Sequence, residues 1–164
     1  MLLTDKVAIP KISSAALSTT VYVYNGKVKT PSVTVKDSKG KVLKKNTDYT
    51  VSYASGRKYV GKYAVKITFK GNYSGTKTLY FYVKPKGTEI SSISARSKGF
   101  RVSWKTQKTQ TTGYQIQYST SSKFTNAKTI TVTKNSNYAK LVSKLYANQK
   151  PLESIILLKI MENN

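Results

Sequence analysis

Residues that commonly carry enzyme chemistry are few in this sequence. There is no Cys and no His, so the chain has neither a thiol nucleophile nor an imidazole base, and zinc sites built from these residues are excluded. Asp37, Asp48 and Glu89 stand far apart, which does not favour a carboxylate pair for acid–base catalysis. We therefore predict no catalytic residues, no cofactor site and no metal site.

The acidic residues have local structural explanations instead. Asp37 opens the segment Asp-Ser-Lys-Gly, and this pattern predicts a turn in which the side chain binds nearby backbone. Asp48 follows a polar corner, and we expect it to accept hydrogen bonds from local backbone. Ser and Thr are abundant but have no accompanying base, so they indicate no nucleophile.

Tyrosine is the residue type with the most scope for binding, and the chain has 13 of them. Tyr22, Tyr24, Tyr80 and Tyr82 alternate with apolar residues, so one set faces a core and the other is exposed. Exposed tyrosines can stack on sugar rings or bases, or they can form cross-strand pairs that stabilise a sheet. The residues considered for ligand contact are Tyr59, Tyr73, Tyr80 and Tyr82.

The chain is strongly basic, with a net charge of +23 from 29 basic and 6 acidic residues. The lysines are spread over every expected strand and turn, which is typical of a solvated surface with protected sheet edges. The alternative is attraction to an anionic polymer such as teichoic acid or an acidic glycan. Specific nucleic-acid binding is not expected, because it depends on clustered arginines, and only Arg57, Arg96 and Arg101 are present.

The elements that must position these residues are β-strands. Residues 48–83 contain three runs in which apolar and polar residues alternate, separated by glycine-containing breaks, as expected for half-buried strands. Similar runs precede and follow, and we count six or seven strands between residues 19 and 84. The fold class is therefore all-β, with two tandem antiparallel sandwiches. The predicted structural core comprises Val51, Val65, Ile67, Phe69, Phe81, Trp104, Tyr114, Ile116 and Leu145.

The domain boundaries follow from where the alternation starts and stops. Residues 1–16 are predicted to be a lead-in segment, with a short edge strand at residues 7–9. Residues 17–86 form the first sandwich, in which Asn25-Gly26 marks a turn. A short linker around residues 84–87 contains Pro85 and Gly87 and leads into a second sandwich over residues 87–164.

The motif order of the first sandwich resembles the repeated Ig-like modules of Firmicutes cell-surface proteins. The likeness covers about residues 17–84. The segments that carry it are residues 24–27 (Tyr-Asn-Gly-Lys), 31–35 (Pro-Ser-Val-Thr-Val), 48–53 (Asp-Tyr-Thr-Val-Ser-Tyr), 60–61 (Val-Gly) and 71–76 (Gly-Asn-Tyr-Ser-Gly-Thr). This resemblance implies a structural or adhesive role and brings no catalytic residues.

The second sandwich resembles a bacterial fibronectin type III domain over residues 88–150. Residues 99–104 match strand B, 113–118 strand C, 129–133 strand C′ and 138–145 strand E. The pattern stops at Pro151, where an Ile/Leu-rich segment replaces the expected strands F and G, as in a truncated or frame-shifted end. Residues 154–161 are expected to fill the strand F position or to form a short amphipathic helix. The missing last strand predicts an unpaired sheet edge that favours self-association.

Function is expected from this architecture rather than from a site. The leading prediction is a non-catalytic spacer and adhesin of a bacterial surface or secreted protein, with cell-wall polymer, glycan or a host or neighbour-cell protein as partner. The alternative is a carbohydrate- or anionic cell-wall-polymer-binding module that uses exposed Tyr and Lys. No apolar run is long enough for a membrane span and the first residues lack a signal-peptide pattern, so an extracellular location requires a larger exported chain.

Overall fold

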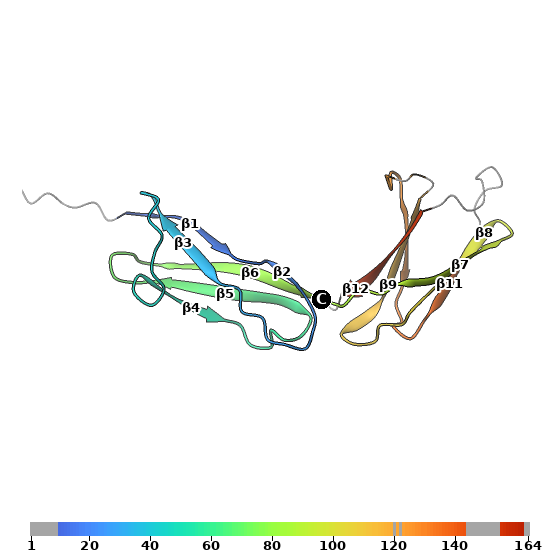
Figure 1. Cartoon of the computed structure of the whole chain (residues 1–164), viewed down its shortest axis with the longest axis horizontal. Coiled ribbons are helices and arrows are strands. Elements are labelled where there is room, and N and C mark those ends of the chain that lie inside the picture. Colours follow the sequence, from blue (N-terminus) through green and yellow to red (C-terminus); the bar gives the residue numbers. More distant parts are fainter. Residues whose placement is uncertain (1–9, 120, 122, 144–154, 163–164) are drawn as a thin grey trace, which may run out of the picture. The chain divides into compact units, whose positions relative to one another are not determined.

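The chain divides into two compact units, Met1–Val83 and Lys84–Asn164. The computed structural model describes residues 10–119, 121 and 123–143, together with the backbone of residues 155–162. Every regular element in these residues is a β-strand, and the strands form four sheets (Figure 1). The all-β fold class is therefore confirmed.

The first unit is a sandwich of a small and a large sheet. The small sheet pairs β1 (Ile12–Leu17) with β3 (Val33–Asp37) in antiparallel orientation. The large sheet has the order β2-β6-β5-β4, with bounds Val21–Val23, Thr76–Lys84, Gly61–Phe69 and Tyr49–Tyr53. In Figure 1 the small sheet lies over the face of the large one, which gives the two layers of a sandwich.

The alternation of residues 48–83 sets which side chains enter the core between these layers. Val65, Ile67 and Phe81 are fully buried, and Phe69 is nearly so. Val51 is partly buried and packs against the same core. The adjoining strands pair in continuous register, from Tyr49 opposite Phe69 to Tyr53 opposite Val65. The predicted faces of these three strands therefore agree with the structure.

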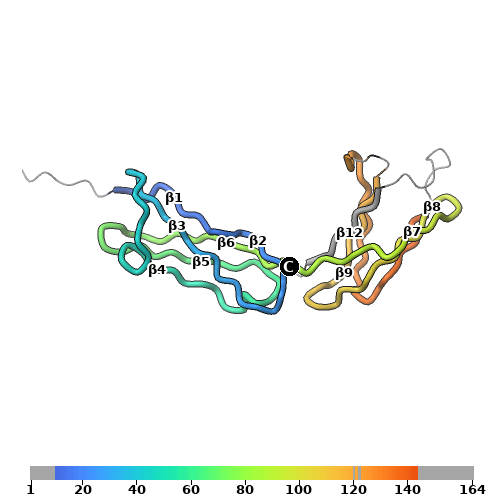
Figure 2. The backbone as a smooth tube through the Cα atoms, in the orientation of Figure 1, coloured from blue at the N-terminus to red at the C-terminus, as the bar shows by residue number. Residues whose placement is uncertain are grey.

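The start of the first unit differs from the sequence-based prediction. Residues 12–16, assigned above to a lead-in segment, form most of β1 and pair with β3. The chain then leaves this sheet, and β2 joins the other sheet beside β6, as the backbone trace shows (Figure 2). The turn at Asn25-Gly26 therefore joins strands of different sheets and closes no hairpin. Five strands, rather than six or seven, lie between residues 19 and 84. The predicted strand at residues 7–9 lies outside the described residues.

The second unit has the strand arrangement of an Ig-like or fibronectin type III-like sandwich. One sheet has the order β11-β8-β7, with bounds Ala139–Val142, Gly99–Trp104 and Ile90–Arg96. The other has the order β10-β9-β12, with bounds Lys128–Val132, Thr111–Ser119 and Ile155–Glu162. These orders correspond to strands E-B-A and C′-C-F of the sandwich.

Aromatic and branched residues fill the core of the second unit. Trp104 and Tyr114 are buried, with ring centroids 5.1 Å apart, and Ile116 is fully buried beside them. Leu145, also predicted as a core residue, lies outside the described residues. The segment predicted as strand F or helix contains a strand, β12, which pairs antiparallel with β9. No described strand pairs with the other edge of β12, and self-association through this edge stays a prediction.

Candidate functional site

Asp48 and Glu89 make contacts that stabilise the fold. The Asp48 carboxylate accepts a hydrogen bond from the backbone N–H of Lys44 at 2.8 Å, which confirms the predicted local role. Glu89 forms an exposed ion pair with Lys105 (2.7 Å), which lowers the pKa of the Glu89 carboxyl and raises that of Lys105. Within the described part of the chain, no three Asp, Glu, His or Cys side chains converge as metal ligands.

Asp37 is a buried carboxylate with a complete set of partners. One oxygen accepts backbone N–H groups of Lys39 and Lys41 at 2.9 and 3.0 Å, which confirms the predicted turn. The other accepts the hydroxyl of Tyr73 at 3.0 Å. Burial acts to raise the pKa of Asp37, but the hydrogen bonds from Tyr73, Lys41 and Lys39 and the charge of Lys41 outweigh it and hold the pKa below its ordinary value.

Tyr73 does not belong to the exposed tyrosines with which it was grouped. Its side chain is only 7% exposed and packs in the core of the first unit. Burial and the bond to Asp37 raise the pKa of the Tyr73 hydroxyl, which keeps it protonated as a donor. Its hydroxyl already has a partner 36 residues away in sequence, so Tyr73 is not an exposed tyrosine, and a ligand contact through its ring stays a prediction.

Other tyrosine hydroxyls of the first unit also donate to backbone carbonyls. Tyr49 donates to Val33 at 3.0 Å, and Tyr53 donates to Pro31 at 2.7 Å, so each ties the large sheet to the chain around β3. Burial raises the pKa of both hydroxyls. These rings therefore stabilise the sandwich and are not available for a partner.

Tyr80 and Tyr82 are two neighbouring tyrosines that the fold of the first unit leaves accessible. They lie on the solvent face of β6, with 48% and 39% of their surface exposed, while Phe81 between them points into the core. Lys62 on β5 stands opposite Tyr82 in the register. Its Nζ lies 4.3 Å from the centroid of the Tyr80 ring and 5.9 Å from that of Tyr82. Cation–π attraction therefore orders a lysine over two exposed rings.

The neighbouring strand extends this surface. On β2 the ring of Tyr22 packs edge-on against Phe81, so Val21 and Val23 leave the opposite face of the strand and are about half exposed. Because β2 lies beside β6, these valines share the face of Tyr80 and Tyr82. We call Val21, Val23, Lys62, Tyr80 and Tyr82 the tyrosine face.

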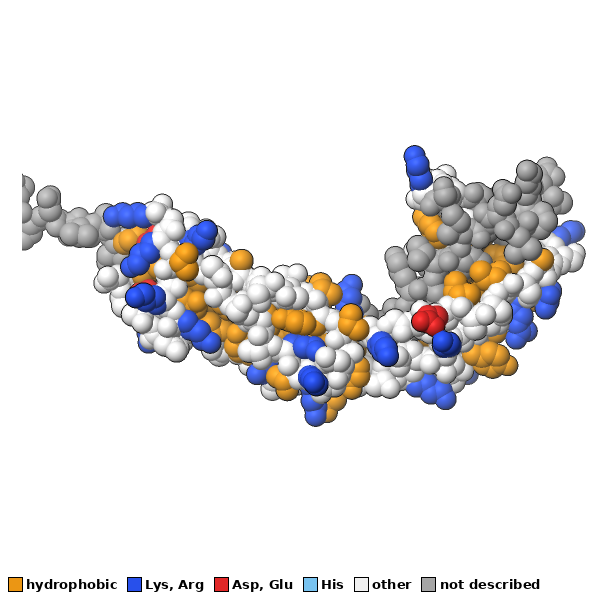
Figure 3. Space-filling model, viewed as in Figure 1, with side chains coloured by type: hydrophobic (Ala, Val, Ile, Leu, Met, Phe, Trp, Pro, Cys, Tyr) orange, Lys and Arg blue, Asp and Glu red, His pale blue; other side chains and the backbone are white. Residues whose placement is uncertain are grey.

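Sequence reasoning missed the central residue of this face, Lys62. The only available signal was the place of Lys62 beside Gly61 at the start of a strand. Its contact with Tyr80 and Tyr82 depends on the register of the β5–β6 hairpin, which the sequence alone does not give. Tyr59, the remaining predicted contact, is 44% exposed on the loop between β4 and β5, where Lys58 Nζ lies 4.8 Å from its ring. Lysine and arginine side chains are scattered over the visible surface of both units rather than gathered into one patch (Figure 3).

The described residues contain no helix with the length and hydropathy that a transmembrane segment needs. The accessible features of the first unit are therefore a strand surface of tyrosine, valine and lysine, and charged loops. Such a surface can stack against a flat ring and attract a negative charge.

The comparisons with known proteins include a similar solved structure. No protein-family model matches the chain, and no curated protein matches it. The crystal structure of the FN1–FN3 domains of chicken CNTN1 is similar, with 19% sequence identity and a TM-score of 0.33 over 92% of this chain. The chain spans 65% of the length of that structure. The assignment of an Ig-like, fibronectin type III-like fold rests on the strand pairing described above.

Proposed function

We propose that the chain is a structural and adhesive module of a larger bacterial surface or secreted protein, in which it acts as a spacer. The observation that carries this proposal is the direct succession of two sandwich units, each with its own buried core. β6 ends at Lys84 and β7 begins at Ile90, so only the five residues 85–89 connect the two sandwiches. Sandwich domains in series are a common way to build a spacer.

Strand pairing also supports a mechanical role. β5 and β6 pair from Gly61 opposite Val83 to Thr68 opposite Thr76, over nearly their whole length. Force applied along these strands must break several backbone hydrogen bonds together rather than one at a time. A catalytic role has no support from the arrangement of described side chains.

Single-molecule stretching of the full chain between two marker domains tests the spacer function. We expect two separate unfolding peaks, each followed by an extension of roughly 200 Å or more, because an unfolded residue spans up to about 3.3–3.6 Å. A chain that lengthens smoothly without force peaks would contradict the proposal.

The second candidate function is binding of a carbohydrate or an anionic cell-wall polymer through the tyrosine face. The observation in its favour is the position of Lys62 Nζ over the rings of Tyr80 and Tyr82, which pairs a positive charge with exposed aromatic surface. Sugar rings can stack on such tyrosines while the ammonium group attracts a phosphate or carboxylate.

Sedimentation with purified Gram-positive cell walls tests this second function. We expect the full chain to sediment with the walls in about 0.5 M salt, at which long-range attraction is screened. The Tyr80→Ala/Tyr82→Ala variant should lose binding, while Tyr138→Ala, at a tyrosine 62% exposed in the second unit, should not. Equal binding by both variants would refute a role for the face. Binding to DNA with a steep loss on adding salt would indicate charge-driven attraction instead.

A further inference from the structure

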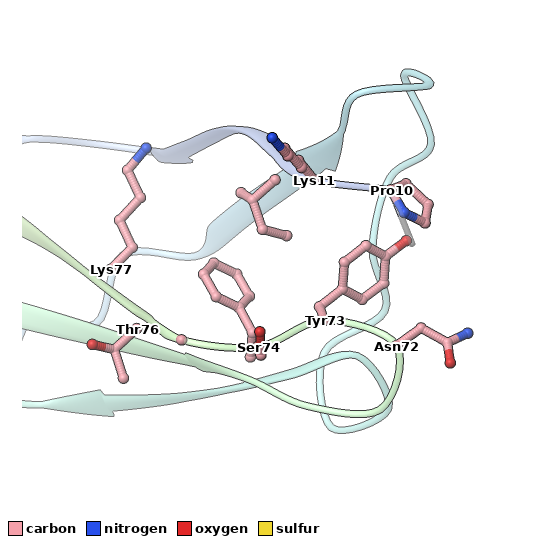
Figure 4. A pocket seen from close by; sticks show the side chains of 10 residues that line it. Pro10, Lys11, Asn72, Tyr73, Ser74, Thr76 and Lys77 are labelled. Carbon is pink, nitrogen blue, oxygen red and sulfur yellow. The ribbon is translucent and has the colours of Figure 1, made fainter. Parts of the chain in front are cut away.

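A separate pocket lies at one end of the first unit. It has a volume of about 520 Å³ and lies between the start of β1 and the loop that joins β5 to β6. Pockets of this size accommodate small molecules in other proteins. The residues that line it are Pro10, Lys11, Ile12, Phe69, Asn72, Tyr73, Ser74, Gly75, Thr76 and Lys77 (Figure 4). None of them belongs to the tyrosine face.

Hydrogen bonds to other elements hold the walls of this pocket. The hydroxyl of Tyr73 donates to the buried carboxylate of Asp37, which fixes the ring against the end of β3. The backbone N–H of Phe69 donates to the carbonyl of Gly75 at 3.0 Å, and that of Lys70 donates to the backbone carbonyl of Asp48 at 2.9 Å. The loop therefore has a defined conformation before any ligand binds, which lowers the entropy cost of binding.

Lys77 occupies an unusual position for a lysine. It is an even number of residues away from Phe81 and Val83 on the same strand, and both of these are buried. It also stands opposite the buried Ile67 in the register. Its side chain therefore leaves β6 on the core-facing side, where the sandwich opens. In Figure 4 the side chain of Lys77 extends from β6 toward β1, and Lys11 lies beside Pro10 near the start of β1.

The chemistry of the lining residues is that of a site for an anionic ring. Lys11 and Lys77 are positive, and no Asp or Glu occurs among the described residues that line the pocket. The Asp37 carboxylate behind Tyr73 is 2% exposed and fully engaged in hydrogen bonds. Ile12, Phe69 and Tyr73 supply apolar walls. Asn72, Ser74 and Thr76 supply hydrogen-bonding groups that match sugar hydroxyls.

From this combination we propose that the pocket binds an acidic sugar unit, such as a uronate residue of a glycan. The two lysines bind the carboxylate, the apolar walls contact the ring, and the polar side chains of the loop bind its hydroxyls. The inference does not depend on the proposed function, because the spacer role and the tyrosine face involve other residues. A failed test of the proposed function would therefore leave the pocket proposal standing, and a failed test of the pocket would leave the proposed function standing.

Titration of the full chain, followed by the amide resonances of the protein, tests the site. Galacturonate is the probe and galactose is its uncharged counterpart. We expect galacturonate to shift the resonances of residues 72–77 in a saturable way, and galactose to shift them far less. Lys77→Gln and Lys11→Gln should each weaken galacturonate binding on the order of tenfold, since each removes one charge-assisted hydrogen bond.

Lys66→Gln is the matched control, because it removes the same charge from an exposed position on β5 that does not line the pocket. It should leave galacturonate binding unchanged. The proposal is overturned by the absence of shifts at residues 72–77, by equal binding of galactose, or by equal weakening in Lys66→Gln. Inorganic phosphate that binds as tightly as galacturonate would overturn the sugar assignment, because only the charge would then matter.

Discussion

At the scale of single residues, Asp37 is the most informative position in the first unit. Its carboxylate is buried and joins three segments: its own turn, the end of β3 and the β5–β6 loop through Tyr73. A buried charge is tolerated only when hydrogen bonds replace its hydration. The low pKa of Asp37 shows that these bonds favour its ionised form over the neutral one.

The pKa direction leads to a prediction about pH. A carboxyl group whose pKa is lowered by folding stabilises the protein above its ordinary pKa, near 3.8, and this contribution is lost as the pH falls toward the folded value. Tyr73→Phe removes one bond to the ionised form. It should lower the midpoint of thermal unfolding of the first unit by several degrees at neutral pH, and by progressively less at lower pH.

The control for this prediction is Tyr80→Phe, which removes a hydroxyl from an exposed ring. We expect no change in its midpoint at any pH. A Tyr73→Phe midpoint that stays below that of the unchanged chain by a constant amount from neutral to acidic pH would contradict the role of Asp37. The pairing of these residues could not be predicted from the sequence, because 36 positions separate them and only the folded sandwich brings them together.

At the scale of elements, alternation predicted most strands of the first unit but neither β1 nor the sheet that each strand joins. The faces of β4, β5 and β6 follow directly from period-two patterns. The segment of residues 12–23 reads as a weak lead-in and one strong strand, whereas the chain divides it between two sheets. Partner choice at sheet edges depends on which backbone groups remain unpaired after folding, which local patterns do not record.

Two glycines of the second unit lie where the close approach of paired strands leaves no room for a side chain. A Cβ at Gly99 would lie 2.0 Å from the carbonyl oxygen of Val142, and one at Gly113 would lie 2.0 Å from that of Val132. These carbonyls belong to the paired strands β11 and β10, so neither can move without disturbing its sheet. Gly113→Ala should therefore destabilise the second unit by roughly 2–4 kcal/mol, measured by denaturant unfolding.

Gly87→Ala provides the comparison for this substitution. No atom lies within 4 Å of a Cβ placed at Gly87, so the same chemical change should alter the unfolding free energy only slightly. If Gly113→Ala changed the unfolding free energy as little as Gly87→Ala, this would contradict the close approach of β9 to β10.

At the scale of the whole molecule, the central claim is that the chain consists of two sandwiches, each stabilised by its own core. Residues 35, 43, 49, 65, 67, 69, 73, 81 and 83 make up the buried apolar core of the first unit, and residues 100, 102, 104, 114, 116, 132 and 142 that of the second. A spacer needs this independence, because each unit must remain folded when its neighbour is perturbed.

One measurement tests this claim most directly. Ile67 and Ile116 are both fully buried, one in each unit, and Trp104 is the only tryptophan of the chain. Each Ile→Val change should cost about 0.5–1.5 kcal/mol. Thermal unfolding followed by Trp104 fluorescence reports the second unit, so its midpoint should fall by about 4–8 °C per kcal/mol in Ile116→Val and stay unchanged in Ile67→Val. An equal fall in both variants would show that the units unfold as one and would contradict the account.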